Sequence, residues 1–167
     1  MSLVELAYSS DEIHPIDIVE TVAEHHAWDF DRMGDDQIAM AVEGQWRTYS
    51  LTLAWSEQDE TLRLICTFEM DPPAARMPAL LETVNLANDQ VWTGAFSYWQ
   101  AQRLMVWRYG LLLSGGQVAG SEQINHMIAA AISAAERFYP AFQLVSWGND
   151  TPQSALKVAI AEAYGRA

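Results

Sequence analysis

The sequence predicts an α+β fold in which helices pack on one side of an antiparallel β-sheet. Segments with apolar residues at spacings of three and four, typical of helices, occur early, in the middle and at the end of the chain. Segments in which apolar and polar residues alternate, typical of strands, form a run of four and a later run of two. The expected order is therefore α-ββββ-α-ββ-α-α, and strands grouped between helices are typical of this class.

The first helix is expected within residues 14–28, where Ile16, Val19, Ala23 and His26 share one face. Residues 28–70 then predict a meander of four short strands, with turns at "MGDD", "EGQ" and "SEQDE". The alternating apolar residues that mark the last three strands are Ile38, Met40 and Val42, then Tyr49, Leu51, Leu53 and Trp55, then Leu62 to Met70. Strict alternation indicates antiparallel strands with one wetter face.

The second half of the chain predicts three helices and two strands. One helix is expected from Met77 to Val91, and two strands within residues 93–116 turn at "WQAQ". A third helix is expected from an N-cap at Ser121 to a stop near Pro140. A final helix at 151–166 has a cap-and-proline start and ends at Gly165.

Length and composition indicate one folded domain over residues 1–167, with a loose N-terminal arm at 1–14. A chain of 167 residues buries about two-thirds of its unfolded surface. Half of its residues are hydrophobic, which is too many for a disordered chain, and no apolar run approaches the roughly 18 residues of a membrane span. No basic or apolar leader segment is visible, so we expect a cytoplasmic protein. The single cysteine, Cys66, lies on the apolar side of a predicted strand and should be buried and inert.

Negative charge is concentrated in the first third of the chain. The sequence has 22 acidic and 9 basic residues, for a net charge of −13. Residues 1–60 hold 14 of the acids and only two bases, Arg32 and Arg47. Such a balance repels phosphate backbones and anionic lipid, so we expect no nucleic-acid and no membrane partner. The acidity indicates either solubility alone or the steering of a basic partner.

No pattern in the sequence predicts catalysis or metal binding. Asp29, Asp31 and Gly34 fit a calcium loop, but Met33 and Met40 stand where two further ligands are needed. The four histidines do not have metal-ligand spacing. No nucleophile elbow, Cys-His-Asp set or paired-carboxylate pattern is recognisable. We therefore expect no enzyme activity, no catalytic residue, no metal and no cofactor.

Three linked segments carry a resemblance to a known family. "LLETVNLANDQVWTGAFSY", "MVWRYGLLLSGG" and "AAERFYPAFQLVSWG" resemble the YbjN family of bacterial sensory transduction regulators, most clearly over residues 78–148. The resemblance implies a fold similar to the type III secretion chaperones and brings no catalytic residues. In its light, Asn85 and Asn88 are expected to serve the turn after their helix, and Trp92 and Phe96 to act as wedges between helix and sheet.

Two functions are compatible with these observations. The first is a non-enzymatic protein-binding regulator or chaperone-like module of bacterial signalling or stress response, which we expect to form a homodimer because such sheets leave an apolar surface to cover. A basic partner segment would meet an aromatic docking surface at Trp99, Met105 and Trp107, and the steering acids would be Asp35, Asp36, Glu57, Asp59 and Glu60. The alternative is a small-molecule sensor or cryptic enzyme with a pocket beside Asn85, Asn88 and Trp92.

Overall fold

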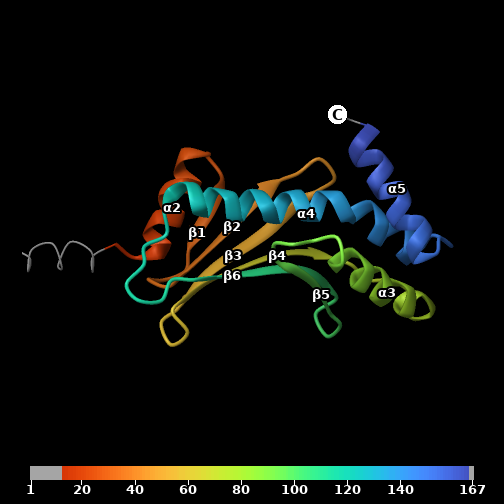
Figure 1. The fold of residues 1–167 in the computed structure, drawn as a ribbon, viewed down its shortest axis with the longest axis horizontal. Coiled ribbons are helices and arrows are strands. Elements are labelled where there is room, and N and C mark those ends of the chain that lie inside the picture. The colour runs from red at the N-terminus through yellow and green to blue at the C-terminus, as the bar shows by residue number, and fades with distance from the viewer. Residues whose placement is uncertain (1–12, 166–167) are drawn as a thin grey trace, which may run out of the picture.

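The computed structural model describes the backbone of residues 13–165 and the side chains of residues 13–160 (Figure 1). Most of the arm expected at 1–14, and residue 166 of the expected last helix, lie outside the described residues. The elements are α2 (Pro15–His25), β1 (Asp29–Arg32), β2 (Gln37–Glu43), β3 (Thr48–Ser56), β4 (Thr61–Glu69), the short 3-10 helix η1 (Ala74–Arg76), α3 (Met77–Asn88), β5 (Ala95–Trp99), β6 (Leu104–Leu112), α4 (Ser121–Trp147) and α5 (Pro152–Gly165). This order confirms the predicted α-ββββ-α-ββ-α-α arrangement.

The six strands form one antiparallel sheet in the order β1-β2-β3-β4-β6-β5. Its hairpin turns fall at residues 33–36, 44–47, 57–60 and 100–103, where the turn residues of the sequence predict them. Register places Leu51, Cys66, Trp107 and Phe96 in one row across four strands, and all four side chains are buried. Period-two alternation then assigns every strand residue to one of two faces.

The helices cover one face of the sheet and leave the other open. In Figure 1, α4 runs along the sheet, α2 lies at one end of it, and α3 and α5 lie at the other. Helix α2 packs on β1, β2 and β3, whereas α4 packs on β4 and β6. The opposite side, which we call the bare face, carries the alternate residues, among them Ala41, Thr52, Ile65 and Arg108. The α+β class with helices on one side of the sheet is therefore confirmed.

Helix α4 is longer than the sequence predicts. It continues through Pro140 to Trp147, so the predicted stop near Pro140 is wrong, and its N-cap is Gly120 rather than Ser121. A proline inside a helix removes one hydrogen bond and costs about 3 kcal/mol. Phe142 and Val145, on the next two turns, are fully buried, and burying such side chains contributes about 1.5–3 kcal/mol each. The free energy contributed by burying Phe142 and Val145 therefore offsets the cost of a proline inside the helix.

Burial in the middle of the sheet controls the chemistry of Cys66. The side chain is fully buried beneath α4's face of the sheet, and this desolvation raises the pKa of the Cys66 thiol to about 12. The thiol is therefore neutral at physiological pH, which agrees with the inert cysteine predicted from the strand pattern.

Within the described residues, no helix is long and apolar enough to cross a bilayer.

Candidate protein-interaction surfaces

The structure separates the three residues of the predicted aromatic docking surface. Met105 and Trp107 are fully buried against the helices, so their assignment to a docking surface is wrong. Trp99 pairs with Leu104, which places it on the bare face with the even-numbered residues of β6, and it is half-buried there. Two neighbouring strands thus direct the predicted residues to opposite faces. Only Trp99 can contact a partner.

The junction between α3 and β5 is structural at Asn88 and Phe96. The Asn88 side chain accepts the backbone N–H of Phe96 at 2.7 Å and donates Nδ2 to the Phe96 carbonyl at 3.0 Å. Phe96 is buried, with its ring 5.6 Å from Phe138 and 5.2 Å from Phe142 between centroids. The turn role expected of Asn88 and the wedge role expected of Phe96 are confirmed.

The other two residues of this junction do not behave as expected. Trp92 is 100% exposed and is therefore not a wedge. It lines a shallow hollow of about 220 Å³ together with Arg137 and other residues of α4, and neither Asn85 nor Asn88 lines it. Asn85 is exposed on α3. The alternative pocket beside Asn85, Asn88 and Trp92 does not assemble, because Asn88 is occupied by Phe96 and Asn85 lies outside the hollow.

The predicted steering acids gather at one end of the sheet, which we call the acidic end. Asp35 and Asp36 lie in the β1–β2 turn, and Glu57, Asp59 and Glu60 lie in the β3–β4 turn, at the same end because the strands are antiparallel. Asp36 binds His14 Nε2 at 2.9 Å, Asp59 pairs with Arg63, and Glu60 accepts the backbone N–H of Gly115 at 3.1 Å. These contacts are made by exposed groups, and among the described residues no three His, Cys, Asp or Glu residues could hold a metal ion.

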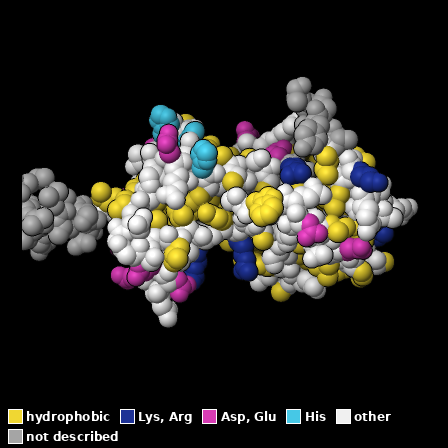
Figure 2. All heavy atoms as spheres, in the orientation of Figure 1, with side chains coloured by type: hydrophobic (Ala, Val, Ile, Leu, Met, Phe, Trp, Pro, Cys, Tyr) yellow, Lys and Arg dark blue, Asp and Glu magenta, His cyan; other side chains and the backbone are white. Residues whose placement is uncertain are grey.

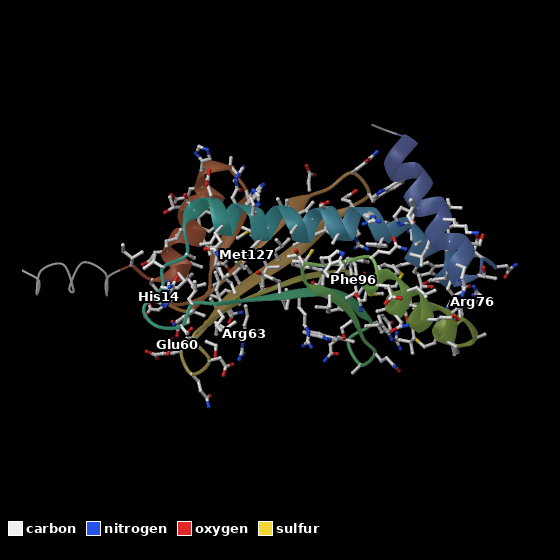
Figure 3. The ribbon with its side chains drawn as sticks, viewed as in Figure 1. His14, Glu60, Arg63, Arg76, Phe96 and Met127 are labelled. Carbon is white, nitrogen blue, oxygen red and sulfur yellow. The ribbon has the colours of Figure 1, made fainter. Side chains whose placement is uncertain are left out.

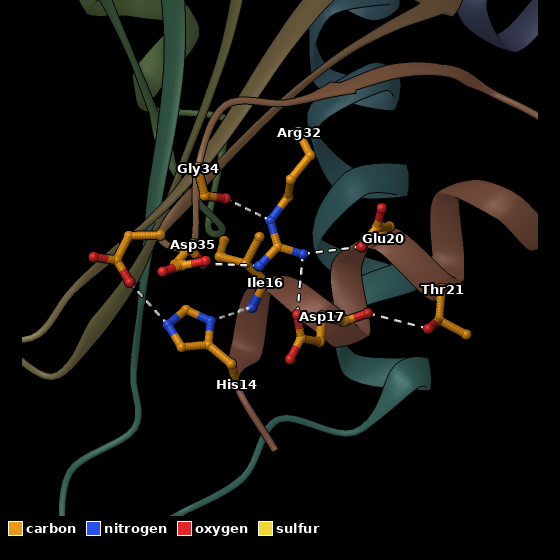
Figure 4. A network of polar contacts seen from close by, with 9 residues as sticks. His14, Ile16, Asp17, Glu20, Thr21, Arg32, Gly34 and Asp35 are labelled. Atoms are coloured by element: carbon orange, nitrogen blue, oxygen red, sulfur yellow. Dashed lines mark hydrogen bonds and ion pairs between the residues drawn. The ribbon is translucent and has the colours of Figure 1, made fainter. Parts of the chain in front are cut away.

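Arg32 holds α2 to the acidic end (Figure 4). Its Nη1 forms ion pairs with Asp17 at 3.0 Å and Glu20 at 2.9 Å, both on α2. Its Nε and Nη2 donate to the carbonyls of Gly34 at 2.7 Å and Asp35 at 2.9 Å. One guanidinium thus joins the helix to the β1–β2 turn through two carboxylates and two backbone oxygens.

The opposite end of the sheet carries an exposed aromatic groove that the sequence did not predict. We call it the Trp46–Trp147 groove; it has a volume of about 530 Å³ and is lined by Trp46, Pro140, Gln143, Leu144, Trp147, Gly148 and Val158. Trp147 is 57% exposed and Trp46 is 39% exposed. Figure 2 shows hydrophobic side chains at the surface of this end of the molecule. Since large aromatic side chains in an open groove are typical of protein interfaces, this is the strongest candidate surface.

Contacts with α4 and with two aromatic rings fix the β2–β3 turn that carries Trp46. Glu136 of α4 accepts the backbone N–H of Trp46 at 3.3 Å, in space that a side chain on Gly44 would occupy. Arg47 lies over two rings, 5.9 Å from the centroid of Phe68 and 5.8 Å from that of Tyr139. The groove wall is therefore ordered before a partner arrives, which lowers the entropic cost of binding.

A second hollow of about 480 Å³ lies on the bare face beside Trp99. It is lined by Thr61, Arg63, Leu64, Ile65, Gly94, Ala95, Trp99, Arg108, Tyr109 and Gly110. Arg63 is engaged by Asp59, whereas Arg108 forms no ion pair with any described residue. Arg108 is therefore the one arginine of this hollow that has no acidic partner among the described residues.

The fold of this chain is similar to that of a protein of known structure, YbjN from E. coli. The crystal structure of YbjN from E. coli, described as "a putative transcription regulator", matches with a TM-score of 0.52 and 10% identity, covering 90% of this chain and 93% of that one. A HopA1–SchA chaperone–effector complex matches with a TM-score of 0.48 and 15% identity, covering 80% of this chain and 93% of that one. No curated protein sequence matches the chain. The YbjN family, described as "Putative bacterial sensory transduction regulator", matches residues 15–144, and the chain belongs to this family.

Proposed function

We propose that the protein is a non-enzymatic, protein-binding regulator of bacterial signalling or stress response that binds its partner in the Trp46–Trp147 groove. The observation that carries the proposal is the meeting of two exposed tryptophans from separate elements, Trp46 on the β2–β3 turn and Trp147 at the end of α4. Tryptophan is among the residues that contribute most to binding energy at interfaces. The regulatory description of the family is consistent with such a role.

The partner that fits this surface is a basic protein segment with apolar side chains. The groove offers Leu144, Val158 and the two indole rings as apolar contacts. The net charge of −13 attracts a basic protein and repels an acidic one over long range. Complementary charge mainly sets the rate of association, whereas the buried aromatic contacts set the affinity.

The test uses a partner captured with the full-length chain and then purified for titration. Trp147→Ala should weaken binding by about 2 kcal/mol, or roughly 30-fold, through faster dissociation. Trp92→Ala is the matched control, because Trp92 is fully exposed but lies outside the groove. Both variants should keep the folded stability of the parent. Equal affinity of the Trp147→Ala variant and the parent would contradict the proposed docking site.

We further propose that the chain is a cytoplasmic homodimer, as expected from the sequence. The support is the bare face, which carries no described helix and includes the half-buried Ile65 and Trp99. Two-fold pairing is the most common way in which such surfaces are covered. Sedimentation at micromolar concentration should show twice the 18.7 kDa mass of one chain. A single 18.7 kDa species would rule out the dimer.

A further inference from the structure

The bare face carries opposite charges on its two sides. Asp29 and Asp31 of β1 lie on one side, where Asp31 pairs with Ala39. Arg108 of β6 lies toward the other side, where it pairs with Ile65. All three charged side chains are exposed, and none of them forms an ion pair with a described residue. These charges are therefore open to a partner.

Register places Asp31 and Arg108 in one row across the sheet. The row runs from Asp31 through Ala39, Thr52 and Ile65 to Arg108. Thr52 of β3 is its middle residue, two strands away from each charged residue. At about 4.8 Å between strands, the two charged residues lie roughly 19 Å apart, which is too far for a contact within one chain. The acid and the arginine are thus placed symmetrically about β3.

The acidic side of the bare face is hollowed. A hollow of about 290 Å³ lies there, and its lining includes Asp29 and Asp31 together with the small residues Ala39 and Ala41. Arg108, at the other end of the row, has a long side chain with a charge opposite to that of the hollow. A guanidinium binds carboxylates through directed, charge-assisted hydrogen bonds. The two sides of the face are therefore complementary in both shape and charge.

We propose that two copies of the chain pair through their bare faces about a two-fold axis that runs parallel to β3, so that Arg108 of each copy enters the acidic hollow of the other. This inference rests on the proposed homodimer and identifies the residues that hold it together. Rotation about this axis exchanges the two sides of the face and keeps each row. Arg108 then lies over the partner's Asp31, and Ile65 lies over the partner's Ala39. Each contact occurs twice, because a two-fold interface is isologous.

A two-fold axis across the strands would bring like charges together instead. It would set β1 over the partner's β1, so that Asp29 and Asp31 would meet the same acids, and it would set Arg108 near the partner's Arg108. Like charges opposite one another oppose binding. Each chain carries a net charge of −13, so two copies already repel one another, and the axis parallel to β3 offsets this with opposite charges. The other acids of the face, Glu43 and Glu69, are exposed at strand ends, where salt screens them.

The bare face has the size and the shape of a dimer interface. At about 3.3 Å per residue and 4.8 Å between strands, its six strands cover roughly 700 Å² in each copy. A standard interface buries about 800 Å² per partner. The middle of the face carries small side chains, among them Ala39, Ala41 and Thr52, which allow two sheets to approach to the spacing of about 10 Å found in stacked sheets.

Sedimentation of charge-reversed variants tests the pairing. Arg108→Glu and Asp31→Arg, each alone, should raise the dissociation constant of the dimer on the order of 100-fold, because both copies of the contact become repulsive. An equimolar mixture of the two variants should restore the dimer, since each contact then joins a cation to an acid. The matched controls are Lys157→Glu on α5 and Glu24→Arg on α2, which are exposed and lie off the bare face. Both controls should dimerise as the parent does.

Three results would overturn the proposal. A parent that sediments as a single 18.7 kDa species would remove the homodimer and this pairing together. A parent dimer that either charge reversal leaves equally tight would remove the pairing alone. So would a mixture that stays monomeric although both variants unfold in urea as the parent does. Neither Arg108 nor Asp31 lines the Trp46–Trp147 groove, so these results are independent of the proposed docking site there.

Discussion

The acidic end and the opposite, aromatic end of the sheet present different chemistry to a partner. The β1–β2 and β3–β4 turns carry five acids, whereas the β2–β3 turn and the end of α4 carry Trp46 and Trp147. β3 has nine residues, which at about 3.3 Å each separates the two ends by roughly 30 Å. A segment bound in the groove therefore does not touch the acids. The acids can act only through their long-range field.

Each end is held by one arginine, but through different partners. Arg32 joins α2 to the β1–β2 turn through the carboxylates of Asp17 and Glu20 and through the carbonyls of two turn residues. Arg76 donates to the carbonyls of Val145 and Asp150, each at 2.7 Å, and so fixes the last turn of α4 and the link to α5. Figure 3 shows Arg76 at the end opposite His14. The arginine of the aromatic end thus bonds to backbone carbonyls, whereas the arginine of the acidic end also forms ion pairs.

The largest expected effect is a loss of folding stability, and it distinguishes a buried tryptophan, Trp107, from an exposed one, Trp92. Trp107 is fully buried, and its ring fills the space that a side chain on Gly94 would need. Trp107→Ala should therefore lower the free energy of unfolding by about 3–5 kcal/mol. Trp92→Ala should leave it within about 0.5 kcal/mol, because Trp92 is fully exposed. Urea denaturation measures both values, and a small loss for Trp107→Ala would contradict its core position.

The two arginines provide the next prediction. Arg76→Ala should lower the free energy of unfolding by about 1.5–3 kcal/mol, because two carbonyls lose charged donors. Arg32→Ala should cost about 1 kcal/mol, because its carboxylate partners are partly exposed. Salt near 1 M should reduce the Arg32→Ala loss more than the Arg76→Ala loss, since it screens ion pairs. Equal salt dependence in urea titrations would show that the two ends are held alike.

The sequence predicted the sheet better than it predicted the surfaces. The strand and turn residues determine the hairpins locally, and period-two alternation places Leu51, Cys66 and Phe96 in the core. Which face a residue occupies on the last two strands depends on register. The pairing of Trp99 with Leu104 places Trp99 on the face opposite Met105 and Trp107, and the packing of α4 on β6 makes the face of Met105 and Trp107 the buried one.

The groove was missed for a different reason, which concerns α4. Pro140 predicts a helix stop, yet the burial of Phe142 stabilises the helix beyond it. Once the helix continues, Pro140, Leu144 and Trp147 follow at spacings of four and three on one outward stripe. This stripe forms half of the groove. The other half, Trp46, comes from a distant turn that only the fold brings near.

The smallest expected effect concerns the acidic end and depends on salt. The variant Asp35→Asn, Asp36→Asn, Glu57→Gln, Asp59→Asn and Glu60→Gln removes five negative charges roughly 30 Å from the groove. The Debye length is about 30 Å at 0.01 M ionic strength but only about 8 Å at 0.15 M. Association with a basic partner should therefore slow severalfold at the lower salt and remain unchanged at the higher, with dissociation unaffected at both. Stopped-flow rates at the two salt concentrations measure this difference. Slower association at 0.15 M would show that the partner reaches the acidic end itself, and the two ends would then form one continuous binding surface.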